Sequence, residues 1–178
     1  EIQPRSPFAH KGSMGNALLV AGKYGMAGAA ILAARACMRS GAGKLIVHTP
    51  QRNAPILQVA VPEAVLHLDR DDMSFSESAP LDDINALAIG PGLGTNEQTC
   101  IAMISQLRRA QCPAVIDADA INILAARHAW LQQLPKGVIL TPHPKEMERL
   151  EGQCTDSYEL LNKARLLAEH IQGYVILK

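Results

Sequence analysis

Short apolar segments that suit β-strands alternate along this chain with longer segments that suit α-helices. Parallel strands need long crossover connections, usually helices, so this alternation predicts a mostly parallel sheet. We therefore expect an α/β fold of three layers, with helices on both faces of the sheet. The expected strands lie near residues 18–22, 44–48, 64–68, 86–89, 114–116, 138–140 and 174–178, and the expected helices near 27–40, 97–109, 156–172 and after 119 and 144.

Composition places the chain among ordinary globular proteins. Its 178 residues suit one domain, which we expect to cover residues 1–178, and 48% of them are hydrophobic and 19% charged. The net charge is zero and aromatic residues make up 3%, whereas a nucleic-acid platform needs a basic face and stacking rings. No apolar stretch is long enough to cross a bilayer, and the first residues show no signal-peptide pattern. We therefore expect neither a nucleic acid nor a membrane as a partner.

The cysteine and histidine patterns indicate the cellular compartment and whether a metal site is present. The four cysteines, at positions 37, 100, 112 and 154, include no CxxC pair, and the six histidines show no metal-ligand spacing. This pattern predicts reduced thiols in a cytoplasmic protein and no transition-metal site. The segment 69–83, rich in acids and serines, is expected to be a surface loop.

The segment TPHPKEMERL at 141–150 follows an apolar strand and leads into a helix. Each proline excludes the α region for the residue before it, so Thr141 and His143 are held extended and Pro144 can open the helix. His143 is therefore fixed at a strand-to-helix junction. In a parallel sheet such junctions lie at the carboxyl edge, where ligands bind beside helix N-termini. A rigid loop with an exposed histidine is the alternative interpretation.

A glycine-rich segment, GPGLG at 90–94, ends another apolar strand. Glycines such as Gly92 and Gly94 tolerate positive φ and let a ligand approach the backbone, while Thr95 or Asn96 can cap the next helix. The segment fits neither the GxGxxG fingerprint nor the Walker A loop. We interpret it as an anion-tolerant loop, with a plain turn as the alternative.

Two carboxylates follow the short strand at 114–116, in the segment AVIDADAIN. Residues two apart on an extended chain face the same side, so Asp117 and Asp119 could both meet one substrate or a hydrated magnesium ion. The alternative is that one carboxylate caps the next helix and the other is solvated. Because two helix-capping carboxylates in succession are redundant, we favour the functional interpretation.

Small residues connect the first strand to an apolar helix in the segment GKYGMAGAA at 22–30. Such residues favour close packing of the helix, and a phosphate contact from the same loop at a helix N-terminus is compatible with that role. The sequence leaves both uses open.

Five motifs, taken in order, resemble one protein family. They are HKGSMG at 10–15, AGKYGMAGAAILAARACMRSGAG at 21–43, GPGLG at 90–94, DADAIN at 117–122 and TPHPKEMERL at 141–150. Together they resemble the ADP/ATP-dependent NAD(P)H-hydrate dehydratases, a branch of the ribokinase-like superfamily. The resemblance implies a lyase that restores hydrated NADH and NADPH (NADHX and NADPHX), with ADP or ATP as a co-substrate and with Mg²⁺. It also implies a homo-oligomer in the full-length protein.

Carried over by position, the resemblance implies a substrate site made of residues from these motifs. The expected dinucleotide-binding residues are Ala29, Gly92, Gly94, Asp117, Asn122, His143, Glu146 and Arg149, and Lys178 is expected to contact the nucleotide phosphates. Glycine backbone and helix N-termini suit a pyrophosphate, and a few directional hydrogen bonds suit a nicotinamide or a ribose.

One motif of the family is absent from these residues. The glycine-rich GxGD segment, whose aspartate serves as the family's general base, occurs nowhere in the 178 residues, so we expect no catalytic residue among them. The expectation is an amino-terminal portion of a ribokinase-like domain, truncated after the last strand. Two alternatives remain: a ribokinase-like kinase of a small vitamin-precursor alcohol, and a fragment that only binds a dinucleotide.

Overall fold

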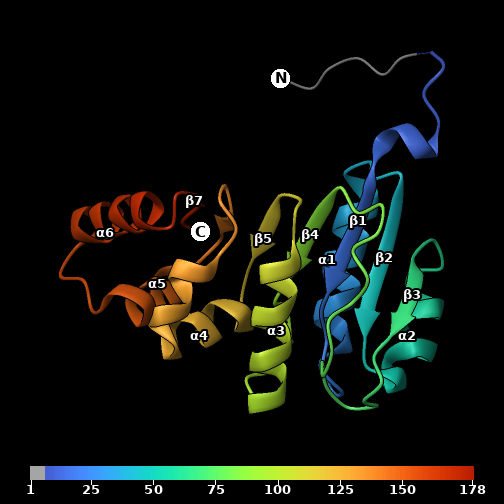
Figure 1. Ribbon diagram of the computed structural model, residues 1–178, viewed down its shortest axis with the longest axis horizontal. Coiled ribbons are helices and arrows are strands. Elements are labelled where there is room, and N and C mark those ends of the chain that lie inside the picture. Colours follow the sequence, from blue (N-terminus) through green and yellow to red (C-terminus); the bar gives the residue numbers. More distant parts are fainter. Residues whose placement is uncertain (1–6) are drawn as a thin grey trace.

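The structure is a computed structural model that describes residues 7–178. Residues 1–6, with which the expected domain begins, lie outside the described residues. Seven strands form one sheet in the order β3-β2-β1-β4-β5-β6-β7, and every neighbouring pair is parallel (Figure 1). The predicted parallel sheet is therefore confirmed. The strands are β1 Asn16–Val20, β2 Lys44–Thr49, β3 Val65–Leu68, β4 Ala86–Ile89, β5 Ala114–Ile116, β6 Ile139–Leu140 and β7 Tyr174–Val175.

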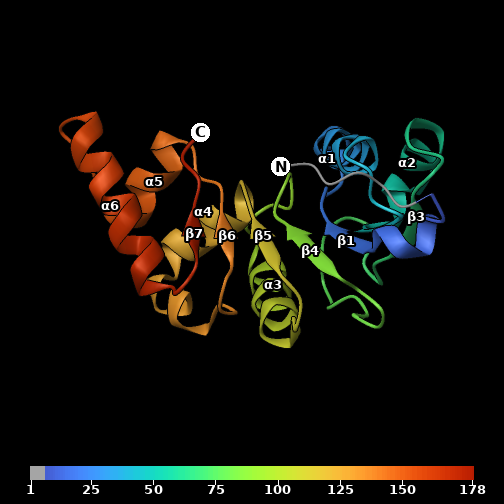
Figure 2. The same ribbon diagram turned by 90° about the horizontal axis from the view of Figure 1, so that it is seen from above.

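Helices cover both faces of this sheet, as the sequence predicts (Figure 2). Helices α1 and α2 pack against one face of β1, β2 and β3, and helices α3 to α6 share the core on the opposite face. The helices are α1 Ala27–Arg39, α2 Ala54–Ala60, α3 Glu97–Arg109, α4 Asp119–Ala126, α5 Pro144–Glu151 and α6 Ser157–His170. Short 3-10 helices cover Lys11–Met14, Gln51–Asn53 and His128–Gln133. Within residues 7–178, the helices are all too short or too polar to cross a membrane.

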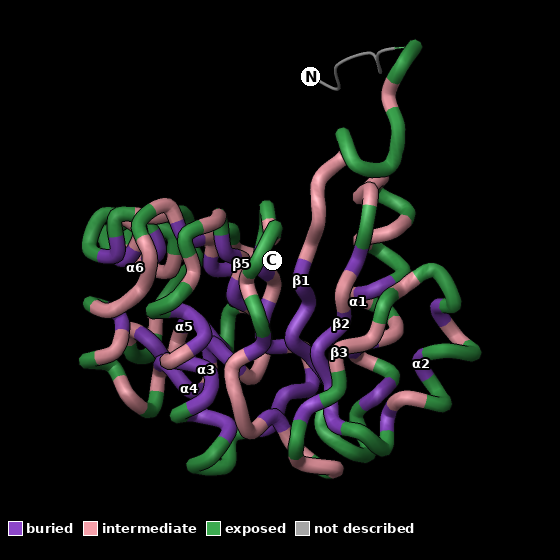
Figure 3. The backbone as a smooth tube through the Cα atoms, turned by 45° about the vertical axis from the view of Figure 1, so that its right-hand side comes forward, coloured by how far each residue is buried: buried purple, intermediate pink, exposed green. Residues whose placement is uncertain are grey.

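Two apolar cores lie on the two faces of the sheet, and buried residues follow the central strands (Figure 3). In β1, Leu18 and Val20 belong to the larger core and Leu19 to the smaller one, with the period of two that a strand imposes. The central strands are consequently buried on both sides. Their sequences therefore read as continuous apolar runs rather than as alternating patterns.

A pair of asparagines joins the amino ends of β1 and β4. The backbone N–H of Asn16 donates to Oδ1 of Asn85 at 2.8 Å, and the backbone N–H of Asn85 donates to the Asn16 carbonyl oxygen at 2.9 Å. The side-chain amide of Asn16 also donates to the carbonyl oxygen of Asp83 at 2.9 Å. Next to this pair, the Gly43 N–H donates to the Gly15 carbonyl oxygen at 3.1 Å. These bonds hold the starts of β2, β1 and β4 side by side.

Some element boundaries differ from those expected. The sequence pattern does not predict α2, because its seven residues are too few to show a helical period and a proline stands at its start. The helix expected at 156–172 is shorter by one residue at its start and two at its end. The strand expected at 174–178 ends at Val175, since only isolated hydrogen bonds continue the pairing with β6.

The segment 69–83 is a loop, as expected, but it is more than a surface loop because three of its residues are buried. Asp69, Phe75 and Ala79 in this segment are buried, and the last two belong to the larger core. The hydroxyl of Thr99 on α3 donates to the Phe75 carbonyl oxygen at 2.9 Å. Polar residues dominate the segment, but a few apolar side chains between them are enough to anchor it over α3.

Candidate functional site

The strand order places a topological switch point between β1 and β4. The chain moves outwards from β1 through β2 to β3 and then returns to form β4 on the other side of β1. The loops that follow β1 and β4, at residues 21–26 and 90–96, therefore lead to helices on opposite faces of the sheet. Open α/β sheets bind ligands at such a point, beside the carboxyl ends of the strands.

Close backbone contacts join these two loops. The Gly22 N–H donates to the Pro91 carbonyl oxygen at 2.9 Å, and the Lys23 N–H donates to the Gly92 carbonyl oxygen at 2.6 Å. Gly92 has a φ of +62°, and a Cβ there would lie 2.9 Å from the Cβ of Ala29. Two of the expected substrate residues, Ala29 and Gly92, are thus in direct contact. The small residues of the first loop serve close packing, as one of their two interpretations predicts.

The helices that leave the two loops begin differently. Helix α3 begins with a cap at Asn96, whose Oδ1 accepts from the Thr99 N–H at 2.8 Å, so the expected cap is confirmed. Helix α1 begins after Met26 without any side-chain cap. No capping side chain therefore offsets the partial positive charge of the α1 N-terminus at the switch point.

The two carboxylates after β5 take different partners. Ala118 between them has φ +51° and ψ −121°, so the chain is not extended there and the argument for a shared face is wrong. Oδ1 of Asp117 lies 2.5 Å from Nζ of Lys178, whereas Oδ2 of Asp119 accepts from the Gly94 N–H at 2.8 Å. Neither side chain caps α4. Joint contact with one ligand stays a prediction.

A chain of hydrogen bonds connects the glycine loop to helix α5. Asp119, which accepts from the Gly94 N–H, also accepts from the Asn122 amide at 3.4 Å. Oδ1 of Asn122 in turn accepts from Nη1 of Arg149 at 2.7 Å. Three residues expected from separate motifs, Gly94, Asn122 and Arg149, are thereby linked through Asp119.

His143 and Glu146 form a reciprocal cap at the start of α5. The Glu146 N–H donates to Nδ1 of His143 at 3.3 Å, and the His143 N–H donates to Oε2 of Glu146 at 3.0 Å. Glu146 is buried, while 45% of the His143 side chain is exposed. Because Nδ1 accepts a hydrogen bond, the neutral ring carries its proton on Nε2. Pro144 opens this helix, as the sequence predicts.

An apolar cavity of about 390 Å³ lies beside Asp117 and Lys178, on the α1 face of the sheet. Its polar lining consists of Asp117, Thr141 and Lys178, and its apolar lining comes mainly from α1, β1, β4 and β5. The Lys178 N–H donates to the Pro142 carbonyl oxygen at 3.1 Å, which holds the lysine against the turn before His143. Lys178 is thus placed next to the carboxyl ends of β5 and β6.

The structure brings the expected site residues to one edge of the sheet in separate groups. The groups are Ala29 with Gly92, Gly94 with Asn122 and Arg149 through Asp119, Asp117 with Lys178, and His143 with Glu146. Within residues 7–178, no hydrogen bond joins His143 directly to the glycine loop. Their assignment to one ligand therefore stays a prediction.

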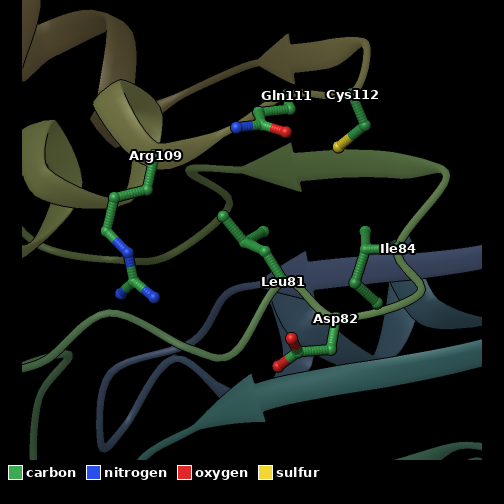
Figure 4. A pocket seen from close by; sticks show the side chains of 6 residues that line it. All are labelled: Leu81, Asp82, Ile84, Arg109, Gln111 and Cys112. Atoms are coloured by element: carbon green, nitrogen blue, oxygen red, sulfur yellow. The ribbon is translucent and has the colours of Figure 1, made fainter.

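Another pocket lies near the opposite, amino edge of the sheet (Figure 4). The segments that precede β4 and β5 supply most of its lining, together with the end of α3. The side chains that line it are Leu81, Asp82, Ile84, Arg109, Gln111 and Cys112. None of the expected site residues is among them.

Sequence reasoning missed a buried polar cluster at the ends of β2 and β3. Oδ2 of Asp69 lies 2.9 Å from Nε2 of His48, and Nδ1 of His48 lies 2.8 Å from Nδ1 of His67. Asp69 also accepts from the backbone N–H groups of Asp71 and Ser76, each at 2.8 Å, and from the Ser76 hydroxyl. Burial alone raises the pKa of Asp69, but these hydrogen bonds outweigh it and hold that pKa well below its usual range. A histidine near the end of each of two expected strands was the available signal.

Comparison with known proteins identifies one family. A family model described as NAD(P)H-hydrate dehydratase matches residues 17–178. The ADP-dependent (S)-NAD(P)H-hydrate dehydratase of Streptococcus thermophilus is 37% identical to the chain, over 98% of the chain and 63% of its own length.

Two solved structures share the fold. A ribokinase-like superfamily protein from Enterococcus faecalis V583 matches with a TM-score of 0.85 and 25% identity, over 99% of this chain and 62% of that protein. The ADP/ATP-dependent NAD(P)H-hydrate dehydratase from Bacillus subtilis, co-crystallized with ATP/Mg²⁺, matches with a TM-score of 0.76 and 34% identity, over 99% of this chain and 62% of that protein. The predicted ribokinase-like fold is thereby confirmed. The chain spans 62% to 63% of the length of these three relatives.

Proposed function

Because the chain belongs to the NAD(P)H-hydrate dehydratase family, we propose that it forms the dinucleotide-binding part of a lyase that restores hydrated NADH and NADPH. The reaction removes water from the hydrated nicotinamide ring and consumes ADP or ATP. The observation that carries the proposal is the chain of hydrogen bonds from Gly94 through Asp119 and Asn122 to Arg149. It joins the strand-to-helix junctions after β4 and β5 to the last turn of α5, beside the edge where an open α/β sheet binds its ligand.

The side chains at this edge suit a dinucleotide. Gly92 and Gly94 let a pyrophosphate approach the backbone, with Ala29 packed behind the loop. Nε2 of His143 lies 3.4 Å from Oε1 of Glu146, and the half-exposed ring can offer this donor to a ribose or a carboxamide. Arg149 supplies a positive charge. Within the described residues no carboxylate neutralises this charge, because the hydrogen bond of Arg149 goes to the neutral amide of Asn122.

The described residues do not by themselves form a magnesium site. Residues 7–178 contain no group of three or more histidine, cysteine, aspartate or glutamate side chains that could hold a metal ion. Asp117 and Asp119 are already engaged by Lys178 and by the Gly94 N–H. Mg²⁺ commonly binds through one or two carboxylates plus substrate phosphates. We therefore propose that Mg²⁺ arrives with the phosphates of the nucleotide, near Lys178.

We assign the catalytic base and the cradle for the transferred phosphate to residues outside these 178. No GxGD motif occurs among them, and the chain spans 63% of the Streptococcus thermophilus relative. A positioned base contributes about 10² to 10⁴ in rate. Residues 1–178 alone are therefore expected to show no turnover of hydrated NADPH with ADP or ATP and Mg²⁺, whereas the complete protein is active.

We further propose a homo-oligomer located in the cytoplasm. Tyr158 and Leu161 on α6 are 81% and 61% exposed, and Val65 on the edge strand β3 is 48% exposed. Contacts between chains would bury such exposed apolar side chains. The four cysteines are free thiols, which suits a reducing compartment. Sedimentation of the complete protein measures its oligomeric state.

The function is tested by following NADPH absorbance when the complete protein receives hydrated NADPH, Mg²⁺ and either ADP or ATP. His143→Ala and His143→Asn separate the ring from the cap, because asparagine also caps helices well. If the ring binds the substrate, both variants lose one hydrogen bond, about 0.5 to 1.5 kcal/mol or up to roughly tenfold in affinity. A loss in His143→Ala alone would assign this residue to capping.

The glycine loop has a matched control. Gly94 and Gly137 have φ values of +79° and +75°, so an alanine at either position carries similar backbone strain. At Gly94 the added Cβ would lie 2.9 Å from Cδ of Lys23, whereas at Gly137 nothing lies within 4 Å. We expect Gly94→Ala, and not Gly137→Ala, to weaken NADPH binding. ATP-dependent turnover of a small alcohol, without repair of hydrated NADPH, would favour the kinase alternative instead.

A further inference from the structure

We propose that Lys23 binds a phosphate group of the dinucleotide substrate, an inference that rests on the proposed function. Lys23 is exposed and lies in the β1–α1 loop, at the switch point of the sheet. Its N–H donates to the Gly92 carbonyl oxygen at 2.6 Å, and its carbonyl oxygen accepts from the Met26 N–H at 2.8 Å. The side chain therefore starts from a turn that is held on both sides.

The side chain of Lys23 extends across the glycine loop. A Cβ placed on Gly94 would lie 2.9 Å from Cδ of Lys23 and 3.7 Å from both Cε and Nζ. Because Gly94 has no Cβ, the aliphatic part of the lysine can rest on the loop backbone. The ammonium group is thereby placed beside Gly94. The N–H of Gly94 donates to Asp119, which is the first bond of the hydrogen-bonded chain to Arg149.

The charges around Lys23 favour an anion. Within residues 7–178, its ammonium group makes no ion pair with a carboxylate. The carboxylates at the same edge have other partners, since Asp117 contacts Lys178 and Asp119 accepts from Gly94 and Asn122. An exposed ammonium group without a carboxylate partner attracts a negatively charged ligand, and lysine binds phosphate as a point charge.

A dinucleotide offers two sources of this chemistry. The pyrophosphate is present in both NADH and NADPH, whereas the 2′-phosphate is present in NADPH alone. A flexible lysine can serve either group, because its ammonium donors are not directionally fixed. The two sources differ in which dinucleotides lose affinity when the charge is removed.

Calorimetric titration of the complete protein with NADH, NADPH and ADP tests the inference. The variants are Lys23→Ala, Lys23→Arg and Lys136→Ala, where Lys136 is an exposed lysine that precedes β6 at the opposite edge of the sheet. Lys23→Ala is expected to weaken dinucleotide binding about three- to tenfold at low salt and less at high salt, as for an exposed charge contact. Lys23→Arg and Lys136→Ala should bind like the wild type.

The outcomes separate the possible contacts. An equal loss for NADH and NADPH assigns the pyrophosphate, and a loss for NADPH alone assigns the 2′-phosphate. The inference is overturned if Lys23→Ala binds both dinucleotides as the wild type does, if it loses affinity for ADP alone, or if Lys136→Ala shows an equal loss. In each of these cases the wild type still binds dinucleotides, so the proposed function stands. A wild-type protein that binds neither dinucleotide overturns both.

Discussion

Replacing Asp69 by asparagine should destabilise the fold more than any conservative change on the surface. The carboxylate is fully buried and accepts hydrogen bonds from His48, from the hydroxyl of Ser76 and from backbone N–H groups that include those of Asp71 and Ser76. An asparagine has one acceptor oxygen where the aspartate has two. Whichever way the amide is oriented, its NH₂ group faces at least one backbone N–H.

The size of the effect follows from these contacts. One buried donor left without an acceptor costs about 1 to 3 kcal/mol, and breaking a buried charged pair costs about 3 to 5 kcal/mol. We expect Asp69→Asn to lower the free energy of unfolding by about 3 kcal/mol. This is the lower end of the range for breaking a buried charged pair, because the asparagine oxygen retains some hydrogen bonds. This is a large share of a typical stability of about 5 to 15 kcal/mol. It corresponds to a fall in Tm of about 6 to 12 °C.

The effect should depend on pH in a defined direction. The folded pKa of Asp69 lies below its unfolded value, so the carboxylate stabilises the fold fully above about pH 4 and loses this contribution as the pH falls through the folded pKa. The difference between wild type and Asp69→Asn should therefore shrink in acid. His67, whose pKa is lowered mainly by burial and further by His48, also destabilises the fold as the pH falls below about 6.5. That contribution is present in both proteins and is smaller in the wild type, because Asp69 raises the pKa of His67.

Thermal unfolding of the complete protein at several pH values measures these differences. Asp82→Asn is the matched control, because Asp82 is exposed and makes no ion pair within the described part of the chain. We expect its Tm to change by no more than about 2 °C, as for an ordinary surface change. An equally small change for Asp69→Asn, or a difference that grows in acid, would refute the reasoning.

Two further predictions concern a close contact after β4 and the free edge of the sheet. Gly90→Ala would place a Cβ on the Asp117 carbonyl oxygen and 2.9 Å from the Cβ of Ala120, so we expect its free energy of unfolding to fall by about 1 to 3 kcal/mol. The control is Gly28→Ala in α1, where an added Cβ meets nothing within 4 Å and should raise the free energy of unfolding by about 0.5 to 1 kcal/mol. Chemical denaturation measures both, and equal stabilities would contradict the packing argument. Residues 1–178 alone should self-associate through the free edge of β7, and Ile176→Lys should reduce this association. Light scattering that shows a monomer at high concentration would count against the edge as the contact.

The strand-to-helix junctions were predictable because their signals are local. Proline before and after His143 fixes the start of α5, and the glycines after β4 fix a loop that tolerates positive φ. Parallel strands then require these junctions to lie at one edge, which the structure shows. The parallel α/β architecture follows from the same local alternation.

The partners of the side chains were not predictable, because they lie far apart in the sequence. The bond from Gly94 to Asp119 spans 25 residues and the contact of His48 with Asp69 spans 21. The switch point also depends on strand order, and sequence periodicity does not specify which strand returns beside β1. The position of Lys23 over the glycine loop therefore follows from the order of the strands and not from the sequence pattern.

The asparagine pair at the amino ends of β1 and β4 has a consequence for how these strands find their alignment. Because β1 is apolar toward both cores, sliding it by one residue would exchange Leu18 and Leu19 between them and still bury leucine on each side. Hydrophobicity alone therefore distinguishes poorly between neighbouring alignments of β1. The bonds between Asn16 and Asn85 form at one alignment only, and each is worth about 0.5 to 1.5 kcal/mol. Polar groups at the strand ends, rather than the apolar residues between them, select the alignment.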